Sequence, residues 1–252
     1  MSIPQNTIEE RVFGIPARKV LLEVRGLVRE YQFAGHVPVA ALNGVDLDIY
    51  HGEFVAITGH SGSGKSTLLN MMGLLDEPSR GTILFDGKDV SLLRERERTE
   101  LRLRSFGFIF QFFNLIESYT AEENIIFQLR LQGHSQIVAR KRAAEIFTFL
   151  DLRDRAHLLP RQLSGGEQQR IAIGRAVAKD SVIILADEPT AHLDTENSRK
   201  VMDLLYRVNQ EFGKTIVLVT HEPGEAAKAT RQISIEDGKI IRVQSRASLT
   251  EL

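Results

Sequence analysis

Nine consecutive residues constrain the fold of this chain more than any other feature. They match the pattern of two glycines with four residues between them, the second followed by Lys and Ser: Gly59, His60, Ser61, Gly62, Ser63, Gly64, Lys65, Ser66 and Thr67. An apolar, β-branched stretch at 54–58 precedes them, and a helical pattern at 68–72 that ends at Gly73 follows. A strand, a glycine loop and a helix in this order predict a phosphate-binding loop, and they argue against a glycine-rich turn that binds nothing.

The chemistry of this loop predicts how it holds a nucleotide. Glycines let the backbone curl so that successive N–H groups, together with the positive end of the following helix, face phosphate oxygens. Lys65 is expected to reach the β- and γ-phosphates, and the Ser66 hydroxyl to bind Mg²⁺.

Composition narrows the class of protein. The 252 residues suit one large α/β domain, and 32 basic side chains against 33 acidic ones give a net charge of -1, which disfavours a general nucleic-acid binder. The chain has no cysteine, so disulfides and thiolate metal sites are excluded. Residues 1–19 lack the apolar core of a signal peptide, and no apolar run approaches the ~20 residues that span a bilayer. We expect a cytoplasmic protein.

The rest of the pattern predicts one domain at 20–244 between tails at 1–19 and 245–252. Strand-like stretches at 20–57 and 81–85 have no helices between them, which favours an antiparallel layer beside the loop. A strand at 106–110 is followed by a helical insert at about 112–160, with helices expected at 121–132 and 136–150. The alternating charges of 94–98 are compatible with a basic surface that binds nucleic acid, but they are more typical of a solvated helix face.

A second glycine stretch lies at 163–170 and reads Leu-Ser-Gly-Gly-Glu-Gln-Gln-Arg. Ser164 and Glu167 form a capping box that opens a helix running to Ala178. Gly165 and Gly166 leave bare amides at the start of that helix, which suits an anion. From the residues alone, an anion site and a merely well-capped helix are equally good interpretations.

Two more strands end in residues that suit phosphate chemistry. The apolar strand at 183–186 ends in Asp187 and Glu188, and ligands of open α/β sheets bind at that edge. Asp187 suits Mg²⁺ and Glu188 suits the polarisation of an attacking water, although solvated acids in a turn are the alternative. The strand at 215–220 ends at His221, which is suited either to the γ-phosphate or to capping the next turn.

Together these residues resemble the ATP-binding subunit of ATP-binding cassette (ABC) transporters, over about 21–243. The stretch 163–170 is similar to the family signature, which other phosphate-loop ATPases lack. The resemblance implies an α/β fold with a P-loop NTPase core, an antiparallel β subdomain and the α-helical insert. It also assigns further residues in the family order: Tyr31 stacking on adenine, Gln111 as the Q-loop glutamine, 192–194 as the D-loop with Asp194, and His221 as the switch histidine.

Segments 110–115 and 121–125 look most like the ATPases of lipoprotein release, macrolide-type export, peptide-antibiotic resistance and the cell-division ABC complex. His60 and His192 depart from the family at tolerant positions. Gly174 replaces the usual Ala of the signature helix, at an expected cost of ~1 kcal/mol of helix stability and none to catalysis.

The resemblance implies a mechanism with ATP and Mg²⁺ as substrate and cofactor. Two copies pair head to tail, so that Ser164 to Glu167 of one chain cover the γ-phosphate held by the other, while Lys65, Gln111, Glu188 and His221 act in hydrolysis and Ser66, Gln111 and Asp187 hold the metal. Closure is passed to a separate membrane permease docked near Gln111–Ile116, at the inner face of the cell membrane. Of the apolar side chains Phe112, Phe113, Leu115 and Ile116, we expect two inside the insert and at least one of the others, tested at Phe113, in a docking groove.

Two other functions remain open at this point. One is a soluble ABC ATPase that acts on nucleic acid or ribosomes, which is disfavoured because the chain has neither an internal repeat nor a long insertion. The other is an ATP-binding regulatory module without turnover, which is disfavoured because every catalytic position holds a competent residue.

Overall fold

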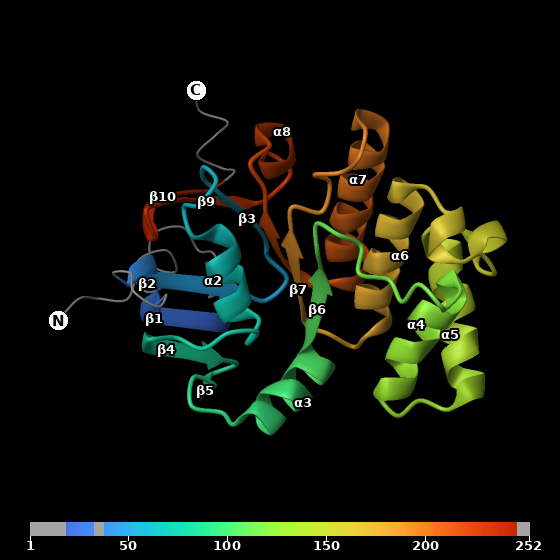
Figure 1. Ribbon diagram of the computed structural model, residues 1–252, viewed down its shortest axis with the longest axis horizontal. Helices are drawn as coiled ribbons and strands as arrows, with labels where there is room; N and C mark the ends of the chain where they lie inside the picture. Colours follow the sequence, from blue (N-terminus) through green and yellow to red (C-terminus); the bar gives the residue numbers. More distant parts are fainter. Residues whose placement is uncertain (1–18, 33–37, 246–252) are drawn as a thin grey trace.

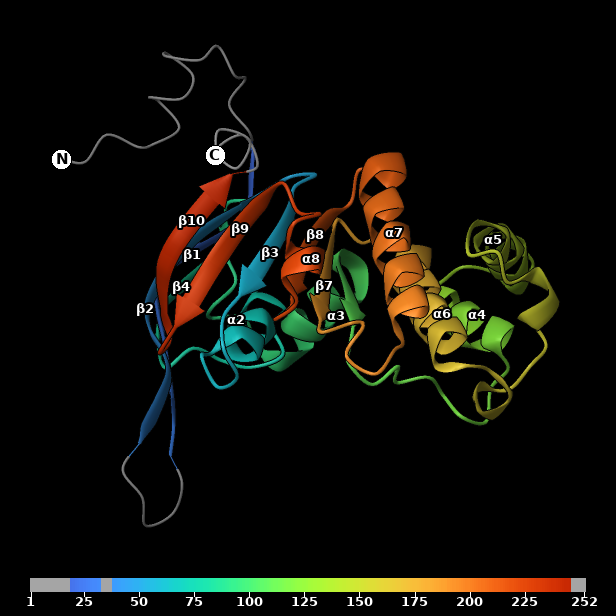
Figure 2. The ribbon, with the colours of Figure 1, turned by 90° about the horizontal axis from the view of Figure 1, so that it is seen from above.

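The computed structural model describes residues 19–32 and 38–245. The predicted tails, 1–19 and 245–252, lie outside this range except for Lys19 and for Ser245, which is the last residue of a strand. Two sheets and several helices make up the described chain. The four-stranded sheet lies at one end, the helices between residues 121 and 212 lie at the other, and the six-stranded sheet lies between them (Figure 1, Figure 2). No described helix is both long and apolar enough to cross a membrane.

The smaller sheet is the antiparallel layer that the sequence predicts. It has the order β2-β1-β4-β5 and is antiparallel throughout. Its strands are β1 (Val20–Tyr31), β2 (Val39–Tyr50), β4 (Arg80–Phe85) and β5 (Lys88–Asp89). One face of this sheet is apolar and packs on α2 (Lys65–Met72), the helix that follows the phosphate-binding loop.

The larger sheet has the order β10-β9-β3-β8-β7-β6, parallel except for β10 at its edge. Its strands are β3 (Phe54–Thr58), β6 (Phe106–Ile109), β7 (Ile183–Asp187), β8 (Thr215–Val219), β9 (Arg231–Glu236) and β10 (Lys239–Ser245). Alternate residues of a strand point to opposite faces, so Phe54 and Ala56 join the core under the helices while Val55 and Ile57 join the core shared with the small sheet. A sheet buried on both faces accounts for the continuous apolar runs in the sequence.

Helices cover the second face of the large sheet, at the yellow and orange end of Figure 1. The predicted insert contains α4 and α5, which begin where the sequence predicts and end one residue earlier. Both helices pack on the signature helix α6 (Gly165–Ala178). The helices of this side are α4 (Ala121–Leu131), α5 (Gln136–Phe149), α6 (Gly165–Ala178) and α7 (Thr195–Phe212), with short 3-10 turns at Arg153–Arg155 and Pro160–Gln162 and the one-turn helix α8 (Pro223–Ala226) near β8.

The charged helix α3 (Glu95–Ser105) differs in part from the expected solvated face. Arg98 is buried, and its guanidinium pairs with Glu77 and Glu95, at 2.7 Å in both cases. The sequence pattern could not show this, because Glu77 lies outside the helix and reaches Arg98 through the fold. These charges brace the helix against the preceding turn.

Gly174 also differs from expectation. A Cβ atom built on it would lie 2.6 Å from Leu150 Cδ1 and 3.0 Å from Ile146 Cγ2, both near the end of α5. The glycine therefore lets α5 approach α6 closely, and this contact offsets the helix propensity that Ala would supply. Treating Gly174 only as a weaker Ala was wrong.

Candidate active site

The phosphate-binding loop joins β3 to α2, and its glycines are required by contacts as well as by dihedral angles. Gly59 has φ 154° and Gly64 has φ 103°. A Cβ on Gly59 would lie 2.2 Å from the carbonyl oxygen of Ile235, and one on Gly64 would lie 2.4 Å from that of Ala41. Backbone atoms cannot yield cheaply, so only glycine fits at either end of the loop.

Inside the loop, one buried ammonium group pairs with no carboxylate, and one buried hydroxyl makes no hydrogen bond among the described residues. Lys65 is only 6 % exposed, and its ammonium donates to the carbonyl oxygens of Gly59, at 3.0 Å, and His60, at 2.8 Å. The hydroxyl of Ser63 is fully buried and has no hydrogen-bond partner among the described residues. A buried ammonium without a carboxylate and an unpartnered hydroxyl fit a loop built around an anionic ligand.

Ser66 meets the acidic end of β7 across 121 residues of sequence. Its hydroxyl donates to Oδ1 of Asp187 at 3.1 Å. Burial raises the pKa of Asp187, while the hydrogen bond from Ser66 opposes that rise. A hydroxyl and a partly desolvated carboxylate side by side are hard oxygen donors, which is the chemistry that Mg²⁺ selects.

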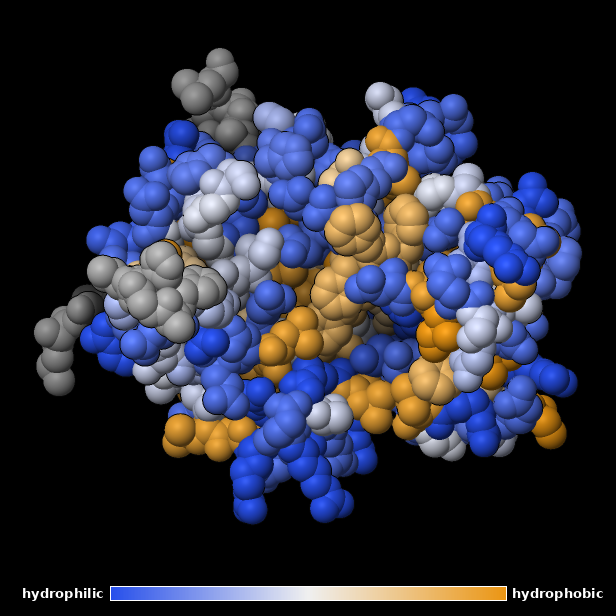
Figure 3. Space-filling model, in the orientation of Figure 1, coloured by the Kyte–Doolittle hydropathy of each residue, from blue (hydrophilic) through white to orange (hydrophobic). Residues whose placement is uncertain are grey.

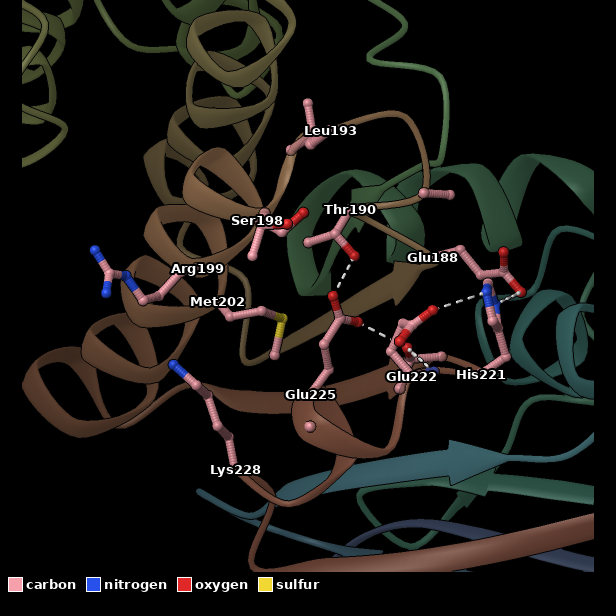
Figure 4. Close-up of a pocket in the computed structure, with 14 residues that line it drawn as sticks. Glu188, Thr190, Leu193, Ser198, Arg199, Met202, His221, Glu222, Glu225 and Lys228 are labelled. Carbon is pink, nitrogen blue, oxygen red and sulfur yellow. Dashed lines mark hydrogen bonds and ion pairs between the residues drawn. The ribbon is translucent and has the colours of Figure 1, made fainter.

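Glu188 and His221 face each other at the ends of β7 and β8. Glu188 has a left-handed backbone, φ 43°, which is uncommon for a residue with a side chain, and its N–H donates to the carbonyl of Val219 at 2.9 Å. His221 Nδ1 lies 3.3 Å from Glu188 Oε1, and its Nε2 lies 3.4 Å from Oε1 of Glu222. Both side chains border a cavity of 520 Å³ (Figure 4). A carboxylate on a constrained backbone beside an imidazole suits the orientation of a water molecule.

The signature stretch is built as its sequence predicts but lies apart from this cluster. The N–H of Glu167 donates to the hydroxyl of Ser164 at 3.3 Å, and the carboxylate of Glu167 accepts from the N–H of Ser164 at 2.8 Å. The described residues show no hydrogen bond or ion pair between 164–167 and the phosphate-binding loop. Instead, Gly166 packs on α7, so closely that a Cβ there would lie 2.9 Å from the Cβ of Asn197.

Asp194 of the D-loop caps α7. Its carboxylate accepts from the N–H of Asn197 at 2.8 Å and from the side-chain amide of Asn197 at 2.7 Å, and these bonds hold its pKa below the usual range. Asn197 therefore connects the D-loop to the signature glycine.

Tyr31 stands at the end of β1. Its hydroxyl donates to Asp76 at 2.9 Å, and the guanidinium of Arg29 lies over its ring, 4.6 Å from the centroid. Thr67 is half-buried in the first turn of α2. Stacking of Tyr31 on adenine stays a prediction.

The apolar segment after Gln111 sends two of its side chains inward, as the sequence predicts, but one of them is Phe113, and the docking groove stays a prediction. Leu115 is buried, and Phe113 is half-buried and packs against the core of the helical side. Phe112 is 67 % exposed and stacks on His192, with ring centroids 4.8 Å apart. Apolar side chains gather in a hollow over the middle of the face in Figure 3. Phe112, rather than Phe113, is the aromatic side chain available to a partner.

Sequence reasoning gave no role to Gln169 and Arg175, which tie α6 to the site. The buried amide of Gln169 donates to the carbonyls of Phe110, at 3.3 Å, and Pro189, at 2.6 Å. Arg175 donates to the carbonyl of Asn114 at 2.6 Å. A signal existed for Gln169, because a polar residue three and four positions before core residues of the same helix lies on the buried face.

The sequence of the chain is similar to known proteins over most of its length. A sequence model described as ABC transporter matches residues 42–191. An uncharacterized ABC transporter ATP-binding protein of Thermotoga maritima is 44% identical over 212 residues, which cover 84% of this chain and 90% of that protein. The macrolide export ATP-binding/permease protein MacB of Wolinella succinogenes is 45% identical over 227 residues, 90% of this chain but 35% of that protein. The chain thus spans about a third of this relative.

Among solved structures, the ATP-binding cassette MJ0796 in a dimeric, post-hydrolysis state with ADP and Pi superposes with a TM-score of 0.83. The two chains are 41% identical, and the match covers 90% of this chain and 99% of that one.

Proposed function

Because the chain belongs to the ABC transporter family, as an ATP-binding ATPase cassette, we propose that it binds and hydrolyses ATP to drive conformational change in a transmembrane permease. One observation carries the proposal: Lys65 and Ser66, Asp187 and Glu188, and His221 converge at the carboxyl ends of three neighbouring strands. This convergence supports a site in which phosphate, metal and water are bound at one edge of the sheet.

The residues of this edge divide the work of hydrolysis. Lys65 and the loop amides bind the β- and γ-phosphates once the ammonium exchanges its carbonyl partners for phosphate oxygens. Glu188 accepts a hydrogen bond from the attacking water and draws its proton away. His221 lies beside Glu188 and orients the γ-phosphate.

Ser66, Asp187 and Gln111 would hold Mg²⁺, and the Ser66–Asp187 contact fits that role. When bound, the metal neutralises charge on the transferred phosphate. Gln111 is half-buried at the end of β6, directly after Phe110, whose carbonyl Gln169 fixes.

The second half of the site comes from a second copy. Among the described residues, no hydrogen bond or ion pair joins the start of α6, at Ser164, Gly165, Gly166 and Glu167, to the phosphate-binding loop of the same chain. The similar cassette MJ0796 is dimeric. In a head-to-tail homodimer these amides and Asp194 close over the γ-phosphate of the partner.

We place the permease contact at Gln111–Ile116, with Phe112 as its anchor. The MacB relatives carry the permease in their name, and a cassette serving one would sit at the inner face of the membrane. Export, lipoprotein release and mechanical transmission all fit this arrangement, and we propose no nucleic-acid partner.

The test uses Glu188→Gln, which keeps the phosphate and metal residues and removes the base. We expect ATP binding to stay within about twofold of wild type while turnover falls by about 10² or more. The variant should form a dimer with ATP and Mg²⁺, measured by light scattering. The matched control is the double variant Glu188→Gln/Lys65→Ala, which should stay monomeric because it lacks the lysine that binds phosphate. Wild-type turnover in Glu188→Gln would refute the role of Glu188, and absence of ATP binding by the unmodified chain would refute the function.

A further inference from the structure

A buried carboxylate outside the predicted site joins the two segments that carry its reactive side chains. Glu225, on α8, is 9 % exposed, and its two oxygens each accept a hydroxyl. One hydroxyl belongs to Thr190, two residues after Glu188, and the other, at 2.7 Å, to Thr220, which directly precedes His221. Figure 4 shows Glu225 reaching between these segments.

Burial of the Glu225 carboxylate carries a free-energy cost, so its hydrogen bonds are essential to the arrangement. Removing a carboxylate from water is unfavourable, and the two charge-assisted bonds are what compensate it. The hydroxyl of Thr220 makes two hydrogen bonds: it donates to Glu225, and its oxygen accepts from the N–H of Glu222 at 3.0 Å. The carboxylate therefore fixes the turn that presents His221 as well as the distance of that turn from residue 190.

The side chains that need this support are the ones at the cavity. The side chain of His221 is half exposed, and its Nδ1 lies 3.3 Å from Oε1 of Glu188, so the reactive groups of the two strands meet there. Their backbones are joined by the β7–β8 ladder, which ends at the bond from Glu188 N–H to the Val219 carbonyl, just before the side chains reach the cavity. A bridge on the far side of each segment removes the remaining freedom.

We propose that Glu225 is a positioning residue for ATP hydrolysis, which holds Glu188 and His221 at their working separation by clamping Thr190 and Thr220. The inference rests on the proposed function. It predicts that Glu225 acts on turnover and not on nucleotide binding, because no described contact joins Glu225 to the phosphate-binding loop.

The experiment compares Glu225→Ala with Glu225→Gln in the full chain. Glu225→Ala leaves both hydroxyls without an acceptor, so kcat should fall about tenfold or more while KM for ATP stays within about twofold. Gln keeps one acceptor and supplies one donor, and a threonine hydroxyl serves either bond, so Glu225→Gln should recover kcat to within about threefold of wild type. Lys228→Met, which breaks the Lys228–Asp203 pair on the same cavity wall, is the control and should leave kcat unchanged.

Each outcome decides the matter. Equal kcat in Glu225→Ala and wild type would overturn the clamp, and so would a Glu225→Gln variant as slow as Glu225→Ala. If Glu225→Ala does not fold, Thr190→Val and Thr220→Val remove one hydroxyl each without changing shape, and normal kcat in both would refute the proposal. A wild-type chain without ATP turnover would refute the proposed function instead.

Discussion

The two signature glycines offer a sharp test of how the signature helix is seated. A Cβ on Gly166 would lie 2.3 Å from Oδ1 of Asn197 and 2.9 Å from its Cβ, whereas a Cβ on Gly165 would come no closer than 3.3 Å, to the methyl end of Leu193. Gly165→Ala and Gly166→Ala therefore add the same methyl group, one residue apart, to very different surroundings.

The magnitudes follow from these contacts. Ala in place of Gly gains up to about 1 kcal/mol in a helix, and less near its start. At Gly166 this gain opposes an overpacking cost of about 1–3 kcal/mol, because Asn197 Cβ is fixed to the backbone of α7. Rotating the Asn197 side chain away also breaks its 2.7 Å bond to Asp194, worth about 1 kcal/mol. We expect Gly166→Ala to destabilise the chain by about 1–3 kcal/mol and Gly165→Ala to change stability by about 0.5 kcal/mol or less.

Equilibrium unfolding in urea measures both variants, and a double variant checks the cause. Asn197→Ala removes the two closest atoms, so Gly166→Ala should cost less by about 1 kcal/mol in that background than in wild type. ATP turnover should fall in Gly166→Ala, since the start of α6 must retreat from α7. Equal midpoints for Gly165→Ala and Gly166→Ala, or strict additivity with Asn197→Ala, would refute the reasoning.

Three further predictions follow. Lys65→Ala should lose ATP affinity and turnover together, since Lys65 contacts phosphate throughout, and normal turnover would contradict the loop assignment. Ser164→Arg should abolish turnover but leave ATP binding to the monomer, measured by titration, within about twofold; equal loss of both would contradict a role in the partner's site. Burial lowers the pKa of Lys179 to about 8, so between about pH 8 and about pH 10 the unfolded chain binds more protons at this residue than the folded chain does. The free energy of unfolding, measured in urea titrations, should therefore rise with pH from about 8 to about 10, and Lys179→Met should flatten the rise.

What the sequence predicted well was set by local chemistry. The phosphate-binding loop follows from its glycines, because Gly59, Gly62 and Gly64 have φ values of 154°, 79° and 103°, which residues with a side chain rarely adopt. The capping box at Ser164 is equally local, since both of its bonds span three residues. Such features carry their geometry in the order of their residues.

What the sequence missed depends on contacts between distant segments. Helix propensity describes Gly174 within α6, but the approach of Leu150 from α5 decides which residue fits there. Charge alternation describes Arg98 within α3, but it cannot show the ion pair that Arg98 forms with Glu77, outside the helix. Glu225 has no local pattern at all, because its partners lie 5 and 35 residues away. Spacing along the chain cannot show which side chains the sheet brings together.

The contacts of α6 explain why its two halves belong to one device. Its start presents Ser164 and the bare amides, while Gln169 and Arg175 further along bind the carbonyls on either side of Phe112. We expect a permease that contacts Phe112 to act on α6 through the carbonyls of Phe110 and Asn114. Gln169 also donates to the carbonyl of Pro189, directly after Glu188, so α6 is bonded to the segment that carries this carboxylate. Under the proposed function we therefore expect permease binding and nucleotide binding to be coupled through α6, each changing the affinity of the other by the same factor.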